Sequence, residues 1–89
     1  MATMFVRHQV ADYAKWKQIY DDFKPTQKKL GVTADTVYRA ADNPNDVTIT
    51  HEFVSIDAAQ KFAASDELHG AMSQAGVVGA PSIWFANRS

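Results

Sequence analysis

The sequence predicts an α+β domain of the ferredoxin-like class, in the order strand, helix, strand, strand, helix, strand. Short runs of alternating apolar residues flank a long amphipathic segment, and a turn-rich segment separates two of these runs. Right-handed crossovers fold this order into a four-stranded antiparallel sheet with helices on one face. We expect a single domain, 1–89, because a chain of 89 residues has no room for a second core.

Residues 4–10 form the first predicted strand, because apolar side chains alternate along this run. The side expected to face the core carries Met4, Val6, His8 and Val10. His8 therefore stands where an aliphatic residue would be expected. An imidazole between an apolar sheet and an aromatic helix suggests a ligand pocket, and the alternative is a core histidine that bonds a backbone carbonyl or a Tyr hydroxyl.

The segment after this strand predicts a helix with Asp12 as its N-cap. Aromatic residues at steps of three and four share one face, and they are Tyr13, Trp16, Tyr20 and Phe23. Pro25 is expected to end this helix near Phe23 or to kink it, with a further turn to Leu30 before a stop at Gly31. The aromatic face is either a wall of the pocket or ordinary core.

Residues 32–41 and 47–54 predict a hairpin around a turn at 42–46, where Pro44 presets the bend. One face of its second strand carries Val47, Ile49, His51 and Phe53. His51 is therefore expected to face or brace the pocket near His8.

Two helices and a strand complete the predicted order. Ser55 or Asp57 caps a helix through about Ala64, and Ser65 caps another that ends at Gly76. Residues 81–87 form the last predicted strand.

Composition excludes several classes of function. Hydrophobic residues make up 46% of the chain, which is enough for a core and excludes a disordered segment. The 9 basic and 10 acidic residues give a net charge of −1, and this balance argues against nucleic acid or an anionic membrane as partner. The chain has no cysteine, which excludes disulfides, thiolate nucleophiles and iron–sulfur clusters. No signal peptide or membrane span is visible, so we expect a cytoplasmic protein.

The sheet is expected to carry apolar residues on both faces. Phe5 opposes Val6, and Trp84 opposes Phe85, yet helices cover one face only. A chain this short buries only about 60–65% of its unfolded surface. We therefore expect a homodimer in which two sheets pack face to face.

The chain resembles the dimeric α+β barrel superfamily, most of all its antibiotic-biosynthesis-monooxygenase-like and small polyketide-cyclase-like branch. The resemblance spans nearly the whole chain and is carried by Val6-Arg7-His8, Val10-Ala11-Asp12-Tyr13, Trp16-Lys17, Gly31-Val32, Tyr38-Arg39, Glu52-Phe53, Ala64-Ser65-Asp66-Glu67-Leu68-His69 and the ending from Gly76 to Trp84. It implies a pocket between the sheet and the helices of each subunit.

The resemblance also implies roles for two histidines. His8 matches a pocket histidine in the first strand of a small polyketide cyclase, and His69 resembles the helical histidine that acts there as catalytic base. Phe62 lies near the place of a cyclase tyrosine and lacks its hydroxyl. Haem-degrading relatives have an asparagine in the first strand, where this chain has Arg7 and His8, which disfavours haem degradation.

We therefore predict His8 and His69 as catalytic residues, because imidazole exchanges protons near neutral pH. The predicted binding residues are His51, Tyr38, Trp16, Tyr20, Phe23, Phe62 and Trp84. We expect no metal site, because no two histidines have metal-ligand spacing. The expected partner is a small aromatic or apolar molecule.

The chain has no nucleotide-binding, acyl-serine or zincin motif, and we expect no cofactor. The function predicted first is a cofactor-independent enzyme that oxygenates a phenol or cyclises a polyketide-like molecule. The alternative is a non-catalytic homodimer, either a small-ligand-binding protein or a stress-related protein.

Overall fold

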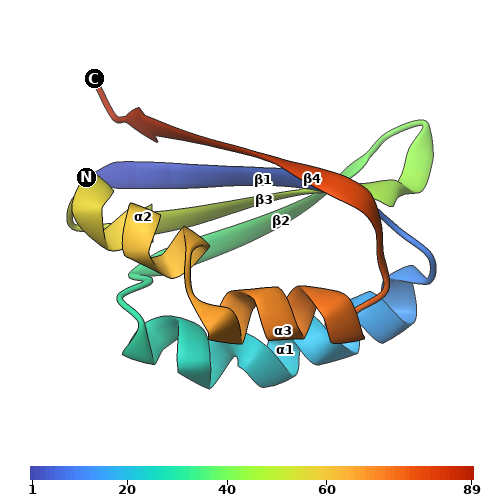
Figure 1. The fold of residues 1–89 in the computed structure, drawn as a ribbon. Helices are drawn as coiled ribbons and strands as arrows, with labels where there is room; N and C mark the ends of the chain where they lie inside the picture. Colours follow the sequence, from blue (N-terminus) through green and yellow to red (C-terminus); the bar gives the residue numbers. More distant parts are fainter.

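The computed structural model describes residues 1–89 and contains one four-stranded antiparallel sheet in the order β2-β3-β1-β4. Three helices lie on one face of this sheet, and the other face is uncovered (Figure 1). The elements are β1 (Ala2–Val10), α1 (Tyr13–Lys29), β2 (Ala34–Ala40), β3 (Asn43–Phe53), α2 (Ile56–Ala63), α3 (Asp66–Gln74) and β4 (Val77–Asn87). The predicted ferredoxin-like fold is confirmed.

The two central strands, β1 and β3, supply the floor of the core. Their alternating faces are buried as predicted, and on each strand one histidine lies in the buried row. In the antiparallel register His8 pairs with Val47, and His51 pairs with Met4. Side chains of directly opposed residues share a face, so both imidazoles point toward the helices.

The helix α1 continues through Pro25 to Lys29 with Leu30 as its C-cap, so the predicted alternative of a further turn to Leu30 is confirmed. Proline removes one backbone hydrogen bond, to the carbonyl four residues earlier. That carbonyl belongs to Asp21, which is exposed, so water can bind it. The expected end near Phe23 is therefore wrong. The N-cap is confirmed, since the Asp12 side chain accepts from the backbone N–H of Lys15.

The predicted turn at 42–46 is shorter in the structure, because β3 begins at Asn43. Ala40 pairs with Asn43 while Arg39 pairs with Val47, so residues 44–46 bulge out of the β2–β3 ladder. Asp46 pairs with Gln9 of β1 instead. Longer pairing with β1 thus extends β3 into the expected turn.

The last strand begins four residues before the predicted start at Pro81. In the β1–β4 register Arg7 pairs with Ser82 and Gln9 with Val78, so the ladder skips His8. Gly79 takes a positive φ of 74° at this irregularity, which a side chain would strain.

The helices α2 and α3 begin as predicted. The hydroxyls of Ser55 and Ser65 accept from the backbone N–H groups of Ala58 and Leu68, respectively. No helix of the protein combines the length and apolar character needed to cross a membrane.

We predict that Pro25→Ala raises the free energy of unfolding by about 1–3 kcal/mol, because alanine restores the hydrogen bond to the Asp21 carbonyl. Urea denaturation of wild type, Pro25→Ala and the exposed control Asp22→Ala measures the difference. A Pro25→Ala variant no more stable than the Asp22→Ala control would contradict the prediction.

Candidate functional site

A cavity of about 40 Å³, partly open at the surface, lies between the sheet and the helices α1 and α3. Its lining is mostly apolar and consists of Val6, His8, Trp16, Ile19, Tyr20, Phe23, Gln27, Ile49, His51, Leu68, Ala71, Met72 and Ala75. This volume has room for about three water molecules. The lining brings together five of the predicted site residues from β1, β3 and α1.

Aromatic packing holds α1 against the two histidines. The rings of Trp16 and Tyr20, one helical turn apart, stack with centroids 5.0 Å apart. The His8 ring meets Trp16 edge-on at 5.8 Å, and the His51 ring lies 6.2 Å from Tyr20. The aromatic face of α1 therefore covers both imidazoles. This packing is consistent with both interpretations of the face, a wall of the pocket and ordinary core.

Both imidazoles are buried and neutral. His8 is 6% exposed and His51 is 3% exposed, and no protein group hydrogen-bonds a ring nitrogen of either residue. Burial lowers the pKa of each ring to about 4, although the carboxylates of Asp46 and Asp35 act in the opposite direction on His8 and His51. The alternative of a core histidine bonded by the protein does not fit His8.

A neutral imidazole carries one N–H donor and one acceptor nitrogen. A buried polar group without a partner costs about 1–3 kcal/mol. Each ring therefore favours a bound molecule that supplies oxygen atoms, which both accept and donate hydrogen bonds.

Tyr20, which lines the cavity, also makes a polar contact. The Tyr20 hydroxyl donates to Oδ2 of Asp35 at 2.5 Å, and burial and this bond raise the pKa of Tyr20. The hydroxyl proton is thus committed to Asp35. Gln27, which is 2% exposed, also lines this cavity.

The sequence reasoning missed Gln27 and Asp35. Gln27 lies four residues after Phe23 and so continues the spacing of the aromatic face, which is the signal that could have found it. Asp35 pairs with His51 in the β2–β3 register. No local sequence pattern specifies that register, so the sequence could not show that the two residues are neighbours.

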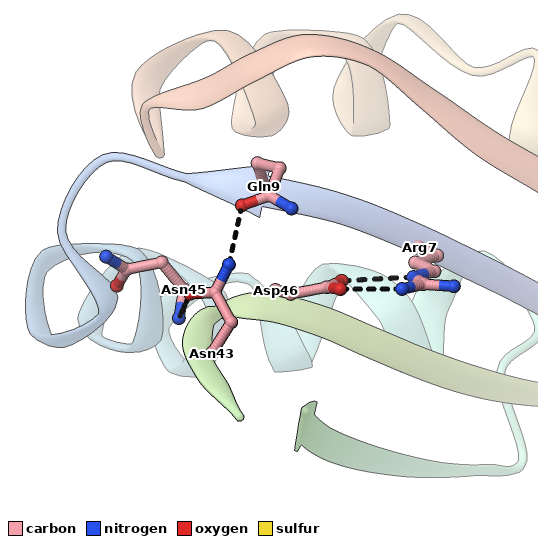
Figure 2. Close-up of polar contacts among 5 residues, drawn as sticks. All are labelled: Arg7, Gln9, Asn43, Asn45 and Asp46. Carbon is pink, nitrogen blue, oxygen red and sulfur yellow. Dashed lines mark hydrogen bonds and ion pairs between the residues drawn. The ribbon is translucent and has the colours of Figure 1, made fainter. Parts of the chain in front are cut away.

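The ends of β1 and β3 carry a network of polar side chains (Figure 2). Arg7 donates from Nε and a terminal nitrogen to the two oxygens of Asp46, at 3.1 and 2.7 Å, a two-pronged contact that lowers the pKa of Asp46. Asn43 donates to Gln9 at 3.4 Å and accepts from the backbone N–H of Asn45. The network keeps an ionised Asp46 beside the strand position of His8.

Several predicted site residues lie outside the cavity. His69 is exposed on α3, where its Nε2 donates to the carbonyl of Ala63 at 3.1 Å. Tyr38, 56% exposed, and Trp84, 44% exposed, lie on the uncovered face of the sheet, where Trp84 stacks on Phe5. Phe62 is buried behind the cavity, with its ring 5.2 Å from His51.

The structure therefore does not bring His69 together with His8. His51 lies in the cavity with His8 instead, because both strands present the same face to α1. No group of three or more His, Asp or Glu side chains gathers in an arrangement that could hold a metal ion.

The fold is shared with solved structures, several of which are described as antibiotic biosynthesis monooxygenases. A candidate antibiotic biosynthesis monooxygenase from Bordetella bronchiseptica matches with a TM-score of 0.86 and 12% identity, over 99% of this chain and 96% of that one. A second candidate monooxygenase, from Caulobacter crescentus, has a TM-score of 0.79 and 17% identity, over 99% and 89%. SnoaB, a cofactor-independent oxygenase from Streptomyces nogalater, has a TM-score of 0.76 and 15% identity, over 99% of this chain and 94% of SnoaB. No family model and no curated protein matches the chain.

We predict that the protein loses stability as the pH falls from 6.5 toward 4. The unfolded histidines bind protons near pH 6.5, whereas the folded rings resist protonation until about pH 4, so acid favours the unfolded chain. The loss is roughly 2 kcal/mol for each ring at pH 5 relative to pH 7.

Urea denaturation at pH 7 and pH 5 measures this loss. The variants His8→Leu and His51→Leu should each remove about half of it, whereas His69→Leu, at an exposed position, serves as the matched control. An unchanged pH dependence in both cavity variants would contradict the prediction.

Proposed function

We propose that this chain, which has the fold of the antibiotic-biosynthesis-monooxygenase-like proteins, is a cofactor-independent enzyme that acts on a small hydroxylated aromatic or polyketide-like molecule. One observation carries the proposal. Two buried, neutral imidazoles without protein partners face a cavity whose remaining lining is almost wholly apolar and aromatic. Such a lining suits a flat apolar ring that carries oxygen atoms.

The chemistry that this arrangement supports is proton removal. Oxygenation of a phenol by dioxygen and cyclisation through an enolate both begin when an O–H or C–H proton leaves the substrate. His8 or His51 accepts this proton, and the new imidazolium lies beside the substrate anion. An adjacent opposite charge raises the pKa of the imidazole, and the Asp46 carboxylate adds to this effect at His8.

The two cavity histidines thus take the proton-handling role that the sequence suggested for His8 and His69. Trp16 and Tyr20 position the ring of the substrate against them, and Gln27, which lines the same cavity, supplies an amide. A dry site strengthens each of these electrostatic interactions.

A non-catalytic small-ligand-binding protein is the second candidate. It is favoured by the pKa of about 4 for both histidines, since imidazoles of such low basicity are weak proton acceptors.

The uncovered face of the sheet supports a homodimer as the assembly of this protein. Phe5 and Trp84 stack there with ring centroids 5.3 Å apart, and Tyr38 lies exposed on the same face. A second copy packed sheet to sheet would remove these rings from water, which is favourable.

We predict turnover of electron-rich phenols, tested as oxygen uptake with mono- and dihydroxynaphthalenes. His8→Leu and His51→Leu should each lower the rate by about 10²-fold or more, the usual contribution of a positioned proton acceptor. Gln18→Leu, an exposed change on α1, is the control. Unchanged turnover in both histidine variants would sink the enzyme proposal. Binding without turnover in wild type would favour the second candidate.

We predict that Trp84→Glu converts a dimer into a monomer, because a buried charge without a partner opposes sheet-to-sheet packing. Sedimentation at micromolar concentration compares wild type, Trp84→Glu and Gln18→Glu, which lies on the helix side. A wild-type monomer, or a dimer that survives Trp84→Glu, would be evidence against this interface.

A further inference from the structure

A second hollow, a groove of about 250 Å³, lies between α3 and β4. Its walls include the apolar side chains of Val77, Pro81 and Ile83, and its polar residues include His69 and Ser73. The proposed function gives this groove no role. It is much larger than the cavity that holds the two buried histidines.

Leu68 and Met72 are the only residues that line both the groove and the cavity. They lie four residues apart on α3 and so occupy the same side of the helix. Two side chains therefore form the wall that these hollows share.

Met72 is the adaptable part of this wall. Met72 is only half-buried, and methionine is unbranched, with three rotatable bonds that let it fill or leave a gap. The helix that carries the wall has only nine residues and contains Gly70, which lowers its intrinsic helix stability. Because Met72 lines both hollows, a change of its rotamer alters the space on each side.

The cavity by itself is too small for an aromatic ring, since it has room for about three water molecules. A ring can enter only if the lining gives way, and the side that faces a ready-made groove is the wall of Leu68 and Met72. Space gained there belongs to one continuous site.

We propose that the groove and the cavity are two subsites of one elongated binding site, with Leu68 and Met72 as the movable wall between them. The ligand is then an elongated molecule, with a hydroxylated aromatic ring in the cavity and a second apolar ring or chain in the groove. This proposal rests on the proposed function, because it assumes that the cavity binds such a ring.

The groove also carries polar groups for the far end of the ligand. Because Nε2 of His69 donates to a backbone carbonyl, Nδ1 is the ring nitrogen left for a ligand. The Ser73 hydroxyl lies four residues along α3 and can donate or accept. A hydroxyl on the distal part of the ligand would complement these groups.

The test compares a short and a long probe, phenol and 4-phenylphenol, by ¹⁵N–¹H correlation NMR. The indole N–H of Trp16 reports on the cavity, and a Trp84→Phe variant identifies its peak, since the chain has two tryptophans. Three variants of α3 are compared, with folding checked in the same spectra: Ser73→Phe fills the groove, Met72→Ala removes part of the wall, and Gln74→Ala is an exposed control.

We expect both probes to shift the Trp16 peak and 4-phenylphenol to bind more tightly. Ser73→Phe should weaken 4-phenylphenol about tenfold and leave phenol unchanged, and Met72→Ala should strengthen 4-phenylphenol by a similar factor. The Gln74→Ala control should match wild type.

Two failures are distinguishable. If both probes shift the Trp16 peak but neither Ser73→Phe nor Met72→Ala changes the binding of 4-phenylphenol, the two-subsite proposal is overturned and the cavity alone binds the ring. If neither probe shifts the Trp16 peak, the cavity binds no aromatic ring, and the proposed function falls together with the two-subsite proposal.

Discussion

The packing of the aromatic face of α1 onto β1 and β3 is the contact on which the rest of this protein depends. Trp16 and Tyr20 stack on each other and lie over the two buried imidazoles, which removes both rings from water. Burial then lowers the histidine pKa values to about 4 and makes the rings neutral. The same packing thus forms the core, defines the cavity and sets the protonation of its polar groups.

This arrangement places stability and function in opposition. An aliphatic residue at either histidine position would suit the core better at low pH, because it carries no charge that folding must desolvate. The chain instead retains two donor and acceptor pairs that no protein group satisfies. Unsatisfied buried groups of this kind mark the places where a fold serves something other than its own stability.

Polar contacts also join the strands and α1 around the cavity. The ion pair between Arg7 and Asp46 joins β1 to β3 beside the position of His8 (Figure 2). The Tyr20 hydroxyl joins α1 to β2 through Asp35. Each acidic residue also raises the pKa of one histidine slightly, against the larger effect of burial. Burial therefore outweighs the carboxylates, and both imidazoles stay neutral near pH 7.

The sequence by itself determined the element order, the caps at Asp12, Ser55 and Ser65, and the buried rows of β1 and β3, because these features depend on local periodicity and side-chain chemistry. Only the tertiary structure decided which of the three histidines meet. The strand register places His51 in the same cavity as His8. His69 lies on another face of α3 and lines the groove on the other side of Leu68 and Met72. The pairing of β1 with β3 and β4 also makes both of these strands start earlier than predicted. Backbone hydrogen bonds with a distant strand outweigh the local turn preference there.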